Sequence, residues 1–162
     1  MAELTQLESK LGEVMGLAQA AQEATGKVKK LVDDEEIQET LEQMSAEAKE
    51  TEERCLQIAD AFDGKKTAIA EQAKETRSEA REMMQTYLGD DADDLDGFEF
   101  LSMAEAGELT HVEIVAQLNE KAGNEQVRAL VETVMPIQQR HVEVTRKATL
   151  TLASREDPNE SA

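Results

Sequence analysis

The chain has 162 residues, of which 36 are Asp or Glu and 17 are Lys or Arg, so its formal net charge of −19 argues against nucleic acid and anionic membranes as partners. Aromatic residues make up only 2% of the chain, and this scarcity beside many Ala, Leu, Glu and Gln residues favours helices over sheet. A single cysteine rules out an intrachain disulfide, and no stretch resembles a membrane span or a secretory leader, so we expect a cytoplasmic protein.

The first half of the chain is predicted to form three helices, at about residues 4–32, 33–62 and 65–88. In each of them apolar residues recur every three or four positions, which is the spacing of one helix face. The acidic residues at 33–36 suit a helix start, because negative side chains there complement the helix dipole. Gly12, Gly16 and Gly26 lower the helix propensity of the first segment.

The second half is predicted to form two more helices, at about residues 98–122 and 124–153. The acidic stretch 90–97 that precedes them has the composition of a linker. Gly123 should end the fourth helix and Asn124 should cap the fifth, so that a tight turn makes the two helices antiparallel neighbours. Residues 155–162 are expected to form a disordered tail, which leaves residues 1–154 as a single helical-bundle domain.

The fourth predicted helix carries the pair Glu108 and His111 on its apolar face. That predicted face consists of Leu101, Ala104, Glu108, His111, Val115, Leu118 and Ala122. In a Glu-x-x-His pattern both side chains project from one side of the helix, one turn apart, and can bind a common metal ion. A carboxylate combined with an imidazole suits iron, manganese or zinc.

The fifth predicted helix carries a related pattern, Gln138 to His141, with Gln in place of Glu. If the turn at residue 123 is the mirror point, His141 lies level with Glu105 on the neighbouring helix. His111 lies about 9 Å further along the axis, at about 1.5 Å per residue. The two imidazoles are therefore not expected to share one ion, whereas Glu105 or Glu108 can contact His141.

A purely structural interpretation of the same residues stays open. A core histidine is usually neutral and hydrogen-bonded, and Glu108 is a suitable partner because a buried carboxylate without one is costly. Cys55 lies on an apolar stripe and is expected to be an inert core thiol. The acidic stretch 90–97 lacks the first and last carboxylates of an EF-hand, so we interpret it as a solvated loop and not as a calcium site.

Over residues 33–153 the chain resembles the ferritin-like superfamily, and most nearly its small bacterial stress-associated members. The resemblance rests on the acidic run 47–52 in the second helix, on Glu108-x-x-His111-x-Glu113, and on the polar-cored last helix. It implies an all-α, ferritin-like antiparallel bundle of about five helices. Members of that superfamily typically hold two metal ions between glutamates and Glu-x-x-His motifs of four helices.

The sequence departs from that scheme at three ligand positions. Ala18 and Ala21 occupy the inner face of the first helix, where a glutamate is wanted, and Gln138 replaces a glutamate in the last helix. The second helix has Glu47 and Glu50 in place of a Glu-x-x-His pair, and both lie off its predicted apolar stripe. The resemblance therefore implies a degenerate centre, mononuclear or incomplete.

Two functions follow as hypotheses, and the sequence leaves open whether the protein is an enzyme. The first is a metal-binding or stress-related protein that holds iron or manganese through Glu108, His111, His141, Glu105 and Glu52. The alternative is a metal-free structural or interaction protein that forms a homodimer through an exposed apolar strip on the first or third helix. A third hypothesis, a helical carrier of a lipid or small molecule, draws on the core rich in Met and Ala.

Overall fold

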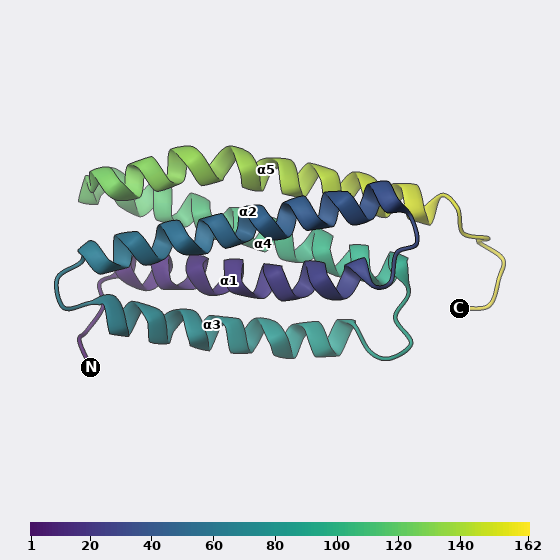
Figure 1. Cartoon of the computed structure of the whole chain (residues 1–162), viewed down its shortest axis with the longest axis horizontal. Coiled ribbons are helices and arrows are strands. Elements are labelled where there is room, and N and C mark those ends of the chain that lie inside the picture. The colour runs from purple at the N-terminus through teal and green to yellow at the C-terminus, as the bar shows by residue number, and fades with distance from the viewer.

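The computed structural model describes residues 1–162 and contains five α-helices and no strand, which confirms the all-α prediction. The helices are α1 (Gln6–Lys29), α2 (Glu35–Ala61), α3 (Lys66–Tyr87), α4 (Asp94–Ala122) and α5 (Glu125–Ala153). They lie along the long axis of the molecule, and each runs antiparallel to the helix that precedes it in the chain (Figure 1). Residues 155–162 follow the last helix as an exposed segment without helical structure.

Side-chain caps fix the first residues of four of the helices. Thr5 and Asp93 each form a capping box with the acid three residues later, and the side chains of Asp34 and Asn124 accept hydrogen bonds from the first free backbone N–H groups. Gly123 has a φ of 65°, the left-handed conformation that ends α4 and turns the chain into α5. The predicted turn between these two helices is therefore confirmed.

The predicted linker at 90–97 is only partly correct, because α4 begins at Asp94. The acidic side chains that were predicted to belong to a solvated loop instead cap the start of α4 and complement its helix dipole. Gly97, inside this first turn, lies against α1: a Cβ atom on Gly97 would be 2.9 Å from a methyl carbon of Val28. The glycine is thus a site of close helix contact and not a linker residue.

Helix α1 lies at the centre of the bundle. It packs against α2, α3 and α4, while α5 completes the assembly against α4 and α2 (Figure 1). Thirteen of the 24 residues of α1 are buried, so it has no continuous exposed apolar strip. Of the two helices predicted to offer a strip for dimerisation, only α3 exposes large apolar side chains, and dimerisation itself stays a prediction.

The hydrophobic core consists of two clusters, one toward each end of the bundle. One cluster includes Leu11, Cys55 and Val115, and the other includes Val28 and Phe98. Between them along α4 and α5 lie buried polar side chains, which divide the apolar interior. This polar layer places charged groups at the middle of the molecule.

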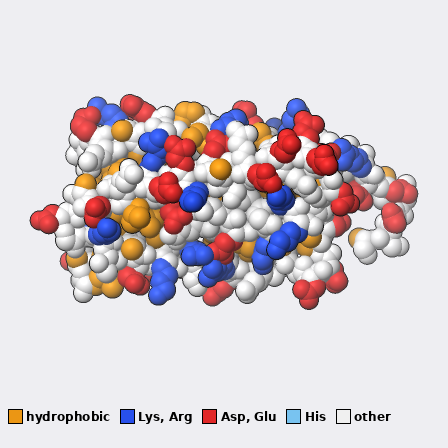
Figure 2. All heavy atoms as spheres, viewed as in Figure 1, with side chains coloured by type: hydrophobic (Ala, Val, Ile, Leu, Met, Phe, Trp, Pro, Cys, Tyr) orange, Lys and Arg blue, Asp and Glu red, His pale blue; other side chains and the backbone are white.

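The outer surface is strongly acidic. Figure 2 shows carboxylates spread over the whole visible face, with Lys and Arg side chains between them. None of the five helices contains an apolar window of the length and hydropathy that a membrane span requires.

Candidate functional site

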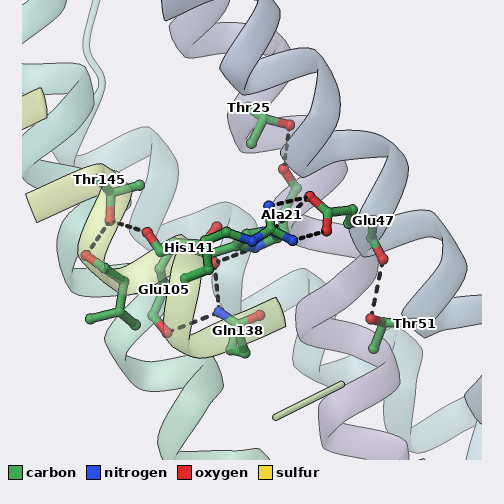
Figure 3. A network of polar contacts seen from close by, with 10 residues as sticks. Ala21, Thr25, Glu47, Thr51, Glu105, Gln138, His141 and Thr145 are labelled. Carbon is green, nitrogen blue, oxygen red and sulfur yellow. Dashed lines mark hydrogen bonds and ion pairs between the residues drawn. The ribbon is translucent and has the colours of Figure 1, made fainter. Parts of the chain in front are cut away.

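The buried polar layer is built around Glu105 of α4 and two residues of α5. Glu105 is 1% exposed and His141 is 3% exposed. The side-chain amide of Gln138 donates hydrogen bonds to the carboxylate of Glu105 at 2.5 Å and to its backbone carbonyl at 3.1 Å. His141 Nδ1 lies 3.3 Å from the same carboxylate oxygen, so Glu105 is held by both side chains (Figure 3).

A second carboxylate, Glu47 of α2, closes the layer from the opposite side. Its Oε1 lies 3.4 Å from His141 Nε2, and both of its oxygens accept hydrogen bonds from the guanidinium of Arg140 (Figure 3). Burial raises the pKa of Glu47, but the hydrogen bond from Arg140 and the charge of His141 outweigh it, so the net pKa is lower than usual. Glu47 is therefore an ionised carboxylate that joins α2 to α5.

His141 lies between these two carboxylates, with one ring nitrogen facing each of them. Both ring nitrogens thus have a carboxylate partner, and Arg140 adds a second basic contact to Glu47. The hydroxyl of Thr145 donates to the His141 carbonyl one turn below. The contacts of this layer thus join α2, α4 and α5.

An apolar groove lies next to this layer, between α1, α3 and α4. Its volume is about 240 Å³, and 12 of its 16 lining residues are hydrophobic. Small side chains such as Ala20, Ala24 and Ala80 form part of the wall, whereas Tyr87 and Phe100 lie together with ring centroids 6.0 Å apart. The surface of this groove is almost wholly apolar.

Glu108 projects into this groove. It is half-buried, and it makes no hydrogen bond or ion pair with any other residue of the chain. Desolvation raises its pKa well above the usual range, and the neighbouring charge of Glu105 raises it further. A carboxyl group with a raised pKa therefore lies at the edge of an apolar surface.

His111 has partners of its own, away from the polar layer. Its Nδ1 lies 2.8 Å from the carbonyl of Gly107, and its Nε2 lies 3.2 Å from Glu13 of α1. Both oxygens of Glu13 also accept hydrogen bonds from Lys10. With a side chain 32% exposed, His111 belongs to the rim of the bundle.

The predicted inner face of α4 is therefore rotated from the observed one. The buried residues of the central and C-terminal parts of this helix are Leu101, Glu105, Val112, Val115 and Asn119. Glu108 and His111 lie beside this face, toward α1 and α3, because α3 covers only part of the adjoining surface. The prediction that both point into the middle of the bundle is wrong, although the predicted pairing of His141 with Glu105 is confirmed.

Glu52, the remaining predicted ligand, also lies apart from the polar layer. Its carboxylate accepts hydrogen bonds from the side-chain amides of Gln19 and Gln22 of α1, at 3.0 and 2.7 Å. Near it, Cys55 is fully buried, and this burial together with the charge of Glu52 raises the thiol pKa to about 12. The prediction that Cys55 is a core thiol is confirmed.

The side chains present do not fit the metal centre that the ferritin-like resemblance implies. Of the five predicted ligands only Glu105 and His141 are in contact, and no group of three or more His, Cys, Asp or Glu side chains has an arrangement that holds a metal ion. Arg140 occupies the position beside Glu47 where a cation is needed. The positive charge of the layer is thus supplied by the chain itself.

From the sequence, Glu47 was predicted to lie off the apolar stripe of the second helix, and Arg140 was given no role. Glu47 follows Met44 by three positions and Arg140 directly precedes His141, so each lies at the border of a buried stripe and not on it. Long side chains at such borders reach inward from exposed backbone positions. The available signal was that Glu47 and Arg140 carry opposite charges at the borders of two buried stripes. Their contact becomes visible only when the structure shows that α2 packs against α5.

Comparison with protein-family models, with curated proteins and with solved structures finds no significant match for this chain. The polar layer and the apolar groove are the two features of the structure that bear on function.

Proposed function

We propose that this chain is a non-catalytic binding protein that holds a small, largely apolar molecule in the groove between α1, α3 and α4. The observation that carries the proposal is Glu108, a carboxyl group without any partner in the chain, placed in a groove of otherwise apolar surface. Ligand sites typically combine an apolar lining with a few polar groups that orient the ligand.

The way in which α3 packs on α1 supports a built groove. In the first half of α1, Gly12 and Gly16 let α3 approach so closely that a Cβ atom at either position would have no space. Further along, Ala20 and Ala24 of α1 face Ala80 of α3 across the groove, and their small side chains leave its volume of about 240 Å³ open. This size lies just below the range of about 300–1,000 Å³ for drug-sized ligands, which suits a compact molecule.

The polar layer has a structural role in this proposal. We propose a ferritin-like bundle without a metal centre, in which Arg140 and His141 replace the cations that balance the inner carboxylates. Arg140 with Glu47 joins α5 to α2, and His141 with Glu105 joins α5 to α4. Elemental analysis of protein purified without chelator tests this part: stoichiometric iron or manganese that disappears in Glu105→Ala would overturn it.

The binding proposal can be tested with the chain's own fluorophore. The protein has no Trp and one Tyr, and that residue, Tyr87, lies on the groove, so its emission reports on this site alone. We expect n-octanol, a neutral apolar probe, to change the Tyr87 emission in a saturable manner. The variant Ala80→Leu, which fills the groove from α3, should weaken this binding about tenfold or more.

A matched control for that variant is Ala46→Leu, which adds the same side chain at an exposed position of α2. It should bind the probe as the wild type does, and circular dichroism should show that both variants stay helical. An emission change that never saturates, or one of equal affinity in Ala80→Leu, would mean that the groove does not bind ligands.

A second candidate function is self-association through the same face. Met83 and Tyr87 of α3 and Met103 of α4 are each more than half exposed, and apolar side chains of this size are enriched at protein interfaces. Sedimentation velocity over a range of micromolar concentrations tests this. A dimer that dissociates in Met103→Glu supports it, and a monomer at every concentration rules it out.

A further inference from the structure

We propose that the groove selects a cationic amphiphile, a molecule with an apolar body and a protonated amine that pairs with Glu108. This inference rests on the proposed binding function and adds the chemical class of the ligand. It follows from the charges that line the groove, the position of Glu108 and the length of the apolar surface.

The groove is lined by two carboxyl groups and by no Lys or Arg side chain. Its titratable lining residues are Glu105, Glu108 and His111 of α4 and Tyr87 of α3, and α1 contributes none. No Lys or Arg lines it, and both oxygens of Glu13 hold Lys10 beside His111. A carboxylate ligand would place a further acidic group beside Glu105 and Glu108 with no Lys or Arg in the lining to receive it, so fatty acids and similar anions are disfavoured.

Glu108 supplies the missing contact for a cation. All other buried or half-buried carboxylates of the polar layer have a basic partner, whereas Glu108 has none. Partial burial of a carboxyl group without a partner is unfavourable, and an ammonium group placed against it would form a charge-assisted hydrogen bond. The pKa of Glu108 is raised in the free protein, and an ammonium group beside it would lower that pKa on binding.

The apolar surface extends away from Glu108 along α4. Phe100 precedes Glu108 by eight residues of continuous helix, so the aromatic end of the groove lies about 12 Å from the carboxyl end at about 1.5 Å per residue. Tyr87 and Phe100 close that end with their paired rings. A ligand with its amine at Glu108 therefore places its apolar body against Ala24, Leu101 and Met84.

Three probes of equal chain length separate the charge of the ligand from its hydrophobicity: octylammonium, n-octanol and octanoate. Tyr87 emission and titration calorimetry at pH 7 measure their dissociation constants. We expect octylammonium to bind about tenfold more tightly than octanol, because a hydrogen bond between charged groups is worth about one power of ten or more in affinity. Octanoate should bind more weakly than octanol.

The variant Glu108→Gln assigns this preference to one side chain. It should abolish the advantage of octylammonium over octanol while octanol itself still binds. The control Glu113→Gln removes the same charge from an exposed position of α4 and should leave the preference unchanged, because the general attraction of an anionic surface for cations is screened by salt.

The outcomes distinguish this inference from the function on which it rests. If octanol and octylammonium bind equally well, or if the preference survives in Glu108→Gln, the assignment of a cationic ligand is overturned while the groove remains a binding site. If neither probe binds, both proposals fail together.

Discussion

Glu105 accepts a hydrogen bond from Gln138 and faces His141, and all three side chains are buried. Groups in such a layer depend on each other, since the loss of one leaves the others desolvated without a partner. The isolated pairing of a carboxylate with a histidine would be unremarkable on the surface. Here it lies where α2, α4 and α5 meet.

We expect Glu105→Ala to lower the free energy of unfolding by about 2–4 kcal/mol, because it removes the buried carboxylate that accepts from Gln138 and faces Nδ1 of His141. Urea denaturation followed by circular dichroism measures the change. The control Glu99→Ala lies on the same helix but is exposed, and it should alter the stability by less than about 0.5 kcal/mol. Equal effects of the two substitutions would contradict the structural role of the layer.

The raised pKa of Glu108 makes stability depend on pH. Between the ordinary glutamate pKa and the raised one, the folded protein keeps a proton that the unfolded chain has released, so a rise in pH favours unfolding. Glutamine does not titrate, and Glu108→Gln should therefore gain stability relative to the wild type as the pH increases from 5 to 8. Thermal melts across this range measure the difference.

Glu113→Gln serves as the reference for that pH series, because Glu113 is exposed on the same helix. The remaining titratable groups of the groove, Glu105, His111 and Tyr87, are present in all three proteins, so the difference reports on Glu108 together with its interaction with Glu105. A constant difference between Glu108→Gln and wild type at every pH would show that Glu108 has an ordinary pKa in the folded state.

The sequence predicted the contact of Glu105 with His141 but not the surroundings of Glu108. The tight turn at Gly123 fixes the register of α4 against α5, and a simple count of residues from it brings Glu105 level with His141. Glu108 was assigned to the wrong surface because a helix face is about 100° wide, and one residue more or less at its border decides which neighbour a side chain meets. That neighbour is α3, whose position the local pattern does not determine.

Among the helices, the contact of α1 with α3 depends on two glycines that the sequence pattern marked as weak points. A Cβ atom at Gly16 would lie 2.4 Å from the carbonyl oxygen of Ala73, and one at Gly12 would lie 2.8 Å from Gln72. The absence of side chains lets the two helices approach each other closely. These glycines thus lower the helix propensity of α1 but permit its close packing against α3.

Two alanine substitutions within α1 should change stability in opposite directions. Gly16→Ala should destabilise the protein by about 1–3 kcal/mol, because the added methyl forces α3 away from α1. Gly26→Ala has no atom within 4 Å of its new Cβ and should stabilise by up to about 1 kcal/mol, as expected for better helix propensity. Chemical denaturation measures both, and a stabilising Gly16→Ala would contradict the close approach.

The helices themselves were largely predictable. All five were expected, and their ends lie within a few residues of the observed ones, because the period of apolar residues and the capping residues are local signals. The exception is α4, which begins at Asp94, since acids that stabilise a first helical turn also resemble a solvated loop. The position of the groove was beyond prediction, because it forms only where side chains of α1, α3 and α4 meet in space.

Over the whole molecule, the net charge of −19 opposes folding, because the compact state brings like charges together. The few ion pairs, such as that of Glu23 with Arg77 and Arg81, offset only part of this repulsion. At an ionic strength of about 0.01 M the screening length is about 30 Å, and at about 0.1 M it is about 10 Å. Much of the repulsion therefore acts across the molecule only at low salt.

We expect the melting temperature to rise by several degrees when NaCl is increased from about 0.01 to 0.5 M, since about 1 kcal/mol corresponds to about 2–4 °C for a chain of this size. Choline chloride at the same ionic strength should give the same shift if screening is the cause. A melting temperature that is independent of salt, or that falls, would show that attractive pairs outweigh the surface repulsion.

The central position of α1 also has a consequence during synthesis. Its three neighbours all follow it in the chain, and α4 ends only at Ala122, so the apolar sides of α1 stay uncovered until most of the sequence has left the ribosome. Helix α2 shields one side early, but the groove side waits for α3 and α4. Nascent chains arrested before α4 should therefore bind chaperones that recognise apolar helices, and they should release them once α4 emerges.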